Sequence, residues 1–164
     1  MAEIVTMTSM WFKPKPQLEV KTSDASLRRH LMDKIKQQQI KNEAAPVVSL
    51  DDFFKGNEDY GSIGCNLTPA IGPQIFYEQL KALRSRPDVQ DILVQISNTN
   101  EDDPDSLMWP FSDQIYILTS ASGEEVAKWL APLRPDEVEP AHINARVRTS
   151  DLESDVEIYR AWWD

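Results

Sequence analysis

Apolar residues recur with a helical period in the first third of the chain. Leu27, Leu31 and Ile35 lie four residues apart in a segment that is otherwise rich in Lys, Arg and Gln. This spacing places the three side chains on one side of a helix. It predicts an amphipathic helix from Ser23 to Asn42, with a polar residue to cap its first turn. The narrow apolar stripe is expected to pack on the rest of the chain or on a second copy of it.

Shorter patterns flank this helix. Residues 2–12 are rich in β-branched and aromatic types and predict a strand, which is ended by Pro14 and Pro16. Residues 47–56 predict a short helix with Ser49 as its N-cap and acidic residues in its first turn. The proline-containing stretch before the amphipathic helix is expected to be a linker.

The remaining sequence predicts two further helices and a set of strands. A proline at a first helical position and a capping box that begins at Ser122 indicate helices near 73–86 and 123–132. Residues 61–67 are a short strand candidate interrupted by glycine. Alternation and β-rich composition predict strands at residues 89–97, 114–119 and 156–163, with 142–149 as a candidate partner of the last. The expected core residues are Phe76, Leu80, Ile92, Val94, Ile117, Val126 and Leu130.

The order of these elements indicates an α+β fold. Residues 61–163 give β-α-β-β-α-β, the ferredoxin-like order, in which an antiparallel sheet carries two helices on one face. The alternative is another α+β layering in which residues 142–149 form an integral strand and the strand order differs. We expect an acidic domain at 47–164, preceded by an N-terminal extension at 1–46.

Charge separates these two predicted parts. The net charge is −10, but residues 1–46 hold eight Lys/Arg and five Asp/Glu, whereas residues 47–164 hold nine and 22. This excess of acids argues against nucleic acid as a partner, because such binding depends on Lys and Arg that neutralise phosphates. A basic protein partner fits the charge better.

Other features of the whole chain favour a cytoplasmic protein. No stretch approaches the roughly 20 apolar residues that span a bilayer, and Glu3 stands where a secretory signal carries positive charge. The single cysteine, Cys65, excludes an internal disulfide and metal sites built from several thiolates. We expect Cys65 to be buried on the strand predicted at 61–67, because no neighbouring base or cation would activate its thiol. No cofactor is indicated.

An acidic loop beside aromatic residues is the first candidate contact site. Glu101, Asp102, Asp103 and Asp105 lie between two predicted strands, and Trp109 follows them. Aromatic residues beside a charged rim are typical of interface anchors. The loop lacks the turn glycine and the final bidentate acid of a calcium-binding loop. The alternatives are a solvated hairpin for the loop and a place in the core for Trp109.

The last residues of the sequence supply a second aromatic candidate. Trp162 and Trp163 are adjacent on a predicted strand, so their side chains point to opposite faces of the sheet. One of them is expected to enter the core. The other is either exposed, which marks a contact surface, or covered by the N-terminal helix or strand. We assign Trp162 to the partner-binding surface.

The candidate catalytic groups have simpler explanations. The acidic pairs Asp51–Asp52 and Glu124–Glu125 lie in predicted first turns of helices, where the helix dipole favours negative charge. His30 and His142 are far apart in sequence, and neither fits a metal-ligand spacing. We expect His30 on the surface of the amphipathic helix. No catalytic residue and no metal ligand is therefore assigned.

Several short motifs after residue 46 carry a resemblance. They are SLDDFF at 49–54, GSIGCNL at 61–67, RPDVQ at 86–90, Trp109-Pro110 and the final WWD. In these motifs the chain resembles a group of small uncharacterised bacterial proteins. The resemblance implies a bacterial source and transfers neither an activity nor a site residue.

Two classes of function are compatible with these observations. The first is a non-catalytic acidic binding module, most concretely an immunity or antitoxin-like protein that inhibits a basic bacterial effector, such as a nuclease. The second is an enzyme whose carboxylate-based or metal-assisted site is assembled from residues distant in sequence. A subunit of a larger complex is a third reading. Charge favours the first.

Overall fold

A computed structural model describes residues 21–41, 44–99, 107–142 and 152–164. The helices are α1 (Ala25–Lys41), α2 (Leu50–Phe54), α3 (Pro73–Arg84) and α4 (Gly123–Leu130), which continues into the 3-10 helix η1 (Ala131–Leu133). The strands are β1 (Val47–Ser49), β2 (Val89–Gln95), β3 (Gln114–Thr119), β4 (Glu137–Pro140) and β5 (Glu157–Trp162).

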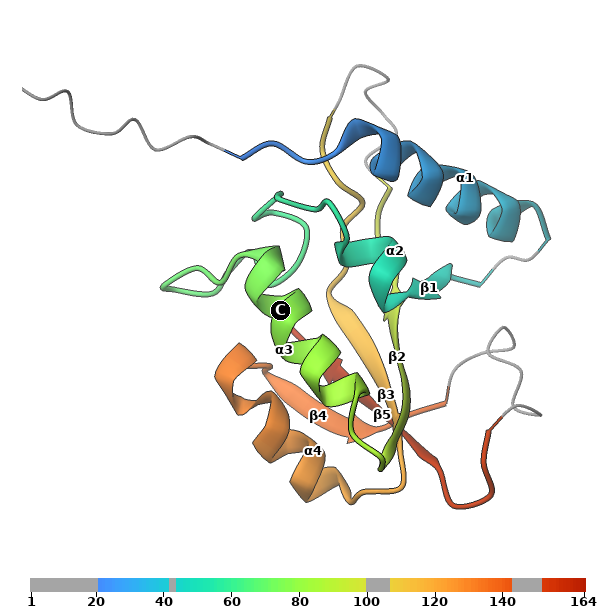
Figure 1. The fold of residues 1–164 in the computed structure, drawn as a ribbon, viewed down its shortest axis with the longest axis vertical. Helices are drawn as coiled ribbons and strands as arrows, with labels where there is room; N and C mark the ends of the chain where they lie inside the picture. The colour runs from blue at the N-terminus through green and yellow to red at the C-terminus, as the bar shows by residue number, and fades with distance from the viewer. Residues whose placement is uncertain (1–20, 42–43, 100–106, 143–151) are drawn as a thin grey trace, which may run out of the picture.

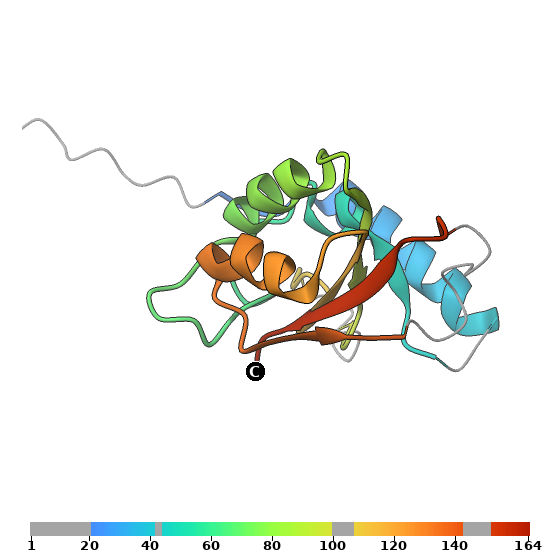
Figure 2. The same ribbon diagram turned by 90° about the horizontal axis from the view of Figure 1, so that it is seen from below.

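The strands form one sheet in the order β1-β2-β3-β5-β4, and every neighbouring pair is antiparallel. Helices α3 and α4 lie side by side on one face of this sheet (Figure 1 and Figure 2). Helices α1 and α2 lie beside the β1 end (Figure 1). The predicted α+β class, with an antiparallel sheet and helices on one face, is confirmed.

The first strand of the predicted ferredoxin-like order is wrong. Residues 61–67 form turns, because the Ser62 amide donates to Asp59 O at 3.0 Å and the Leu67 amide donates to Gly64 O at 3.1 Å. Gly64 has φ +57°, a conformation that a strand residue does not adopt. Instead β1 pairs directly with β2, so no strand is inserted between them as the split βαβ arrangement requires.

Helix α1 matches the predicted amphipathic helix. The Asp24 carboxylate caps it by accepting the Ser26 and Leu27 amides at 2.9 and 3.0 Å. Leu31 and Ile35 are fully buried in the same hydrophobic cluster as the residues of the sheet and of α3. The stripe therefore packs within the chain. The predicted strand at residues 2–12 lies outside the described residues, and the division of the chain at residue 46 stays a prediction.

Two other predicted elements change in extent. Ser49 caps α2 as expected, its Oγ accepting the Asp52 amide at 3.1 Å, but Val47 and Val48 belong to β1 rather than to a helix. Strand β5 pairs with β4 as well as with β3, and β4 lies in a stretch where the sequence predicts no strand. Most of the alternative strand at 142–149 lies outside the described residues.

The core is formed between the sheet and its helices. All seven predicted core residues are fully buried, and the predicted helices that carry four of them are confirmed as α3 and α4. Trp163 is 2% exposed, and its indole Nε1 donates to Leu133 O at 2.9 Å. One residue of the terminal tryptophan pair thus enters the core, as the alternation predicted.

The two edges of the sheet are closed differently. At β1, the side-chain amide of Gln38 on α1 donates to Val47 O at 2.8 Å and accepts the Val47 amide at 3.0 Å. This amide takes the place of a neighbouring strand. At β4, the Ala141 amide donates to Ile158 O, so by alternation the backbone of Pro140 faces away from β5. Pro140 offers no N–H to a further strand.

Candidate functional site

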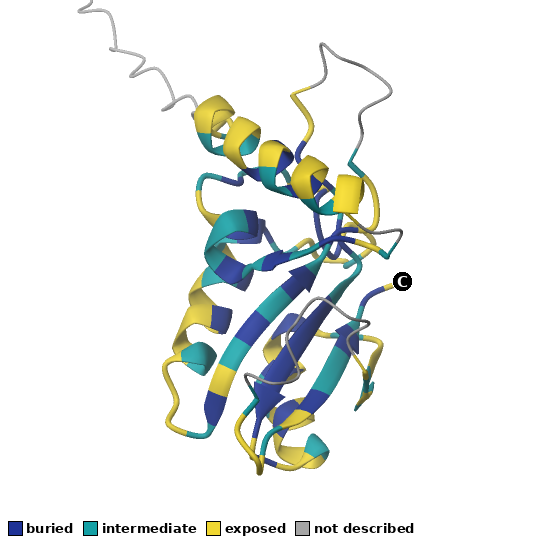
Figure 3. Cartoon of the chain, turned by 90° about the vertical axis from the view of Figure 1, so that its right-hand side faces the viewer, coloured by how far each residue is buried: buried dark blue, intermediate teal, exposed yellow. Residues whose placement is uncertain are grey.

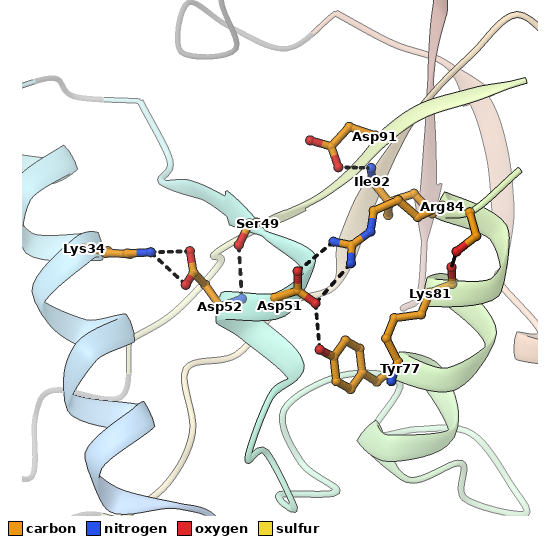
Figure 4. A network of polar contacts seen from close by, with 10 residues as sticks. Lys34, Ser49, Asp51, Asp52, Tyr77, Lys81, Arg84, Asp91 and Ile92 are labelled. Atoms are coloured by element: carbon orange, nitrogen blue, oxygen red, sulfur yellow. Dashed lines mark hydrogen bonds and ion pairs between the residues drawn. The ribbon is translucent and has the colours of Figure 1, made fainter. Parts of the chain in front are cut away.

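A network of polar contacts joins α1, α2 and α3 (Figure 4). The Asp51 carboxylate accepts two hydrogen bonds from the Arg84 guanidinium, at 3.0 and 3.1 Å, and one from Tyr77 Oη at 2.7 Å. Lys81 Nζ lies 4.1 Å from the centre of the Tyr77 ring. Asp51 on α2 is therefore held by two side chains of α3, and Lys81 packs over one of them.

A second ion pair ties α2 to α1. Lys34 Nζ donates to both Asp52 carboxylate oxygens, at 2.8 and 2.7 Å (Figure 4). Beside it lies a small groove of about 250 Å³, lined by Leu27, His30, Asp51, Asp52 and Lys55. The groove has a mixed lining of two acids, a lysine and a histidine, and both of its acids are already engaged.

The electrostatics of this network favour a structural role. The hydrogen bonds from Arg84 and Tyr77 lower the pKa of Asp51, so this carboxylate is ionised at neutral pH. Burial and the bond to Asp51 raise the pKa of Tyr77 to about 12, so the phenol keeps its proton. A general acid or base needs a pKa near the working pH. Asp51 and Tyr77 are moved away from neutrality in opposite directions, which suits them to fastening helices.

We expect Asp51→Asn to lower the free energy of unfolding at pH 7 by about 1 kcal/mol. The variant removes the half-exposed carboxylate that accepts both hydrogen bonds from Arg84. The folded-state pKa of Asp51 is lowered, so its contribution is present above the usual aspartate pKa of about 3.9 and is lost as pH falls through the lowered value. The stabilities of the wild-type chain and the variant should therefore converge at low pH. Urea unfolding of both chains from pH 7 down to pH 3 measures this convergence.

The control for this variant is Asp33→Asn on the exposed surface of α1, which removes the same charge without removing a described ion pair. Its effect at pH 7 should be close to zero. Equal effects of the two variants at pH 7 would show that the Arg84 pairing adds no stability.

The predicted contact residues are placed very differently by the structure. Glu101, Asp102, Asp103 and Asp105 lie outside the described residues, so the acidic loop stays a prediction. Trp109 is fully buried in the main hydrophobic cluster, and its amide donates to Asp59 Oδ2 at 3.0 Å.

The assignment of Trp109 to a contact surface is therefore corrected to the core. The physical reason is its burial against the chain's own apolar side chains, which leaves no ring surface for a partner. Its neighbours Leu107 and Met108 are 76% and 55% exposed. Of these three neighbouring large side chains, only that of Trp109 is buried.

Trp162 is half-buried and lies on the face of the sheet opposite α3 and α4. Its position is set by register, because Gln114 and Glu137 are its direct partners on β3 and β4. Residues paired in this way point to the same face of an antiparallel sheet. We call the group around it the Trp162 face, which comprises Gln95, Gln114, Tyr116, Arg160, Trp162 and Glu137.

Three exposed acidic residues lie close to the backbone of Trp162. Asp136, Glu137 and Asp164 are all exposed. The Asp136 amide donates to Trp162 O at 2.8 Å, and the Asp164 amide donates to Asp136 Oδ2 at 2.8 Å. The sequence analysis identified Trp162 but missed these acids. It predicted no strand at residues 137–140, so nothing in the sequence connected this stretch with Trp162.

The remaining sequence candidates lie apart. Cys65 is exposed in a turn, which corrects its predicted burial on a strand, and its Sγ donates to Asn66 Oδ1 at 3.5 Å. His30 is exposed on α1, as predicted, and His142 is exposed after β4. In the ranges that the structure describes, no three His, Cys, Asp or Glu residues are grouped as metal ligands. None of the described helices is long and apolar enough to span a membrane.

A comparison with protein families gives one match to most of the chain. The model of the "Uncharacterized protein YfbO family" matches residues 26–162, from α1 to the end of β5. The chain belongs to this family. An Escherichia coli (strain K12) relative described as "Uncharacterized protein YfbO" is 46% identical over 93 residues, which are 56% of this chain and 63% of that protein.

The chain therefore spans less than two thirds of the length of this relative. The predicted resemblance to small uncharacterised bacterial proteins is confirmed. No solved structure gave a significant match.

Proposed function

We propose that the chain is a non-catalytic acidic protein-binding module, most concretely an immunity or antitoxin-like inhibitor of a basic bacterial effector. The observation that supports this proposal is the half-buried Trp162 on the sheet face opposite α3 and α4, with exposed Glu137 as its partner on β4 and exposed Asp136 and Asp164 close to it along the backbone. An aromatic anchor within a charged rim is a common arrangement at protein interfaces.

Long-range attraction follows from the charge of the chain. Residues 47–164 hold 22 Asp/Glu and nine Lys/Arg, and five of these acids form ion pairs among the described residues. The other acids keep this part strongly negative. Such a field speeds the capture of a positively charged protein, and salt screens it over about 8 to 10 Å at physiological ionic strength.

Affinity capture with the full chain, followed by co-expression, tests the proposal. We expect a retained protein that is strongly basic and impairs growth when it is expressed alone, and we expect co-expression of this chain to restore growth. A retained partner that is acidic, or a basic partner whose effect on growth is unchanged by the chain, would contradict the inhibitor proposal.

With that partner, the acidic loop can be tested by kinetics. Changing Glu101, Asp102, Asp103 and Asp105 to Gln or Asn should slow association several-fold and flatten its dependence on salt, because these charges act at long range. Trp162→Ala should mainly speed dissociation, because an anchor acts after contact. Surface plasmon resonance at two salt concentrations separates the two rates. An unchanged association rate without the four charges would remove the loop from the interface.

A further inference from the structure

On the sheet face opposite α3 and α4, Tyr116, Leu118 and Ile158 are buried in a second apolar cluster, against which Leu152 and Val156 pack. The Trp162 face lies beside this cluster and shares Tyr116 with it. There Gln95, Gln114 and Trp162 are half-buried. In the view of Figure 3, α3 and α4 lie behind the sheet, on its other face.

The Trp162 face combines apolar surface with hydrogen-bonding groups. Tyr116 is 6% exposed, and its hydroxyl donates to Gln95 Oε1 at 2.6 Å, which fixes both side chains at the centre of the face. Trp162 lies one row away, opposite Gln114. The face is thus partly rigid before a partner arrives, which reduces the entropy lost on binding.

Cations are scarce on this face. Arg160 is its one Lys or Arg among the described residues, and it is paired with Glu139 on β4. Glu137, in the row of Trp162, is exposed and has no described ion-pair partner. An unpaired carboxylate beside a tryptophan ring is complementary to a lysine or arginine side chain, which both groups attract.

Strand addition at an edge is a poorer way to bind here. One edge is occupied by Gln38, which already satisfies both backbone groups of Val47. The other edge ends at Pro140, which has no N–H to donate, and it carries acidic side chains. A partner is therefore better received by the face than by an edge.

We propose that the Trp162 face is the docking surface for the basic partner of the proposed function, with a partner lysine or arginine seated over Trp162 beside Glu137. This inference rests on the proposed function and deepens it by naming the site. The partner's cation faces the tryptophan ring, and its neighbouring groups cover the half-buried Gln114.

Nitrogen-15 NMR on the full chain tests the site with a synthetic peptide of alternating Lys and Ala as the probe. The five tryptophans give five indole N–H signals, which Trp→Phe variants assign. We expect the peptide to shift the Trp162 signal and to leave the signals of the buried Trp109 and Trp163 in place. A peptide of alternating Glu and Ala should shift none of them.

Charge variants supply the matched control. Glu137→Lys should weaken peptide binding about tenfold, because repulsion replaces attraction at contact distance. Glu78→Lys makes the same charge change on the exposed surface of α3, across the sheet, and should weaken binding less than twofold. Glu137→Gln, a milder change, should give an intermediate loss and covers the case in which the lysine variant fails to fold.

The possible outcomes separate the site from the function. Equal losses from Glu137→Lys and Glu78→Lys, or an unmoved Trp162 signal while other signals shift, would overturn the Trp162 face and leave a basic partner in place. If the basic peptide shifts no signal at low salt, the proposed recognition of basic proteins fails, and the site fails with it.

Discussion

Replacing Trp109 with alanine is expected to lower the free energy of unfolding by about 3 to 5 kcal/mol. The whole indole is buried in the main cluster, so its removal leaves a cavity that the surrounding core cannot fill. The Trp109 amide is also held by Asp59 at 3.0 Å, which limits how far this segment can collapse into the space. Urea denaturation, followed by far-UV circular dichroism, measures the loss.

Trp162→Ala is the natural control for this experiment. Trp162 is half-buried on the sheet face opposite α3 and α4, so its removal should cost clearly less stability while it weakens binding of the basic probe. The two variants should therefore separate core from contact surface. If Trp109→Ala loses no more stability than Trp162→Ala, the placement of Trp109 in the core is wrong.

Deletion of residues 1–44 is expected to destabilise the chain at least as strongly. It removes Leu31, Met32 and Ile35 from the core, and burial of each such side chain stabilises by roughly 1.5 to 3 kcal/mol. It also removes the Lys34 ion pair to Asp52 and the Gln38 bonds to β1. The sum approaches the 5 to 15 kcal/mol that stabilises a typical domain. We expect unfolding, or a melting temperature lower by roughly 10 °C or more.

Deletion of residues 1–20 is the matched control, because it keeps α1 and every contact described for it. Calorimetry and sedimentation of the two truncated chains beside the intact one give the comparison. A chain lacking residues 1–44 that melts and sediments like the intact chain would show that α1 is dispensable for the fold.

Helices could be predicted from the sequence better than strands. Period-four spacing located α1, and the capping box from Ser122 located α4, since the Ser122 and Glu125 side chains bond each other's backbone amides as the motif requires. These signals are local. The strand predicted at 61–67 is wrong although Ile63 is buried, because the backbone of this segment forms hydrogen bonds within its own turns. An apolar residue in a short run indicates burial, but it does not show with which segment the backbone pairs.

The candidate site was predictable in part. Alternation showed that Trp162 and Trp163 face opposite ways, which the burial of Trp163 confirms. It could not show that Glu137 lies opposite Trp162, because β4 has the sequence EVEP, whose acids and proline have low strand propensity. Trp109 was misassigned for a related reason, since an aromatic residue after an acidic loop has the same local pattern in a core as at an interface.

The strand order has a consequence for how the chain folds. Strand β5 follows β4 in the chain, yet it is inserted between β3 and β4 in the sheet. Until β5 is in place, β4 has no neighbour and β3 is paired on one side alone. The sheet therefore cannot grow strand by strand in the order of synthesis, and its completion waits for a long-range pairing, which is the slow kind of event in folding. The residues that carry Trp162 are thus among the last to gain their native neighbours.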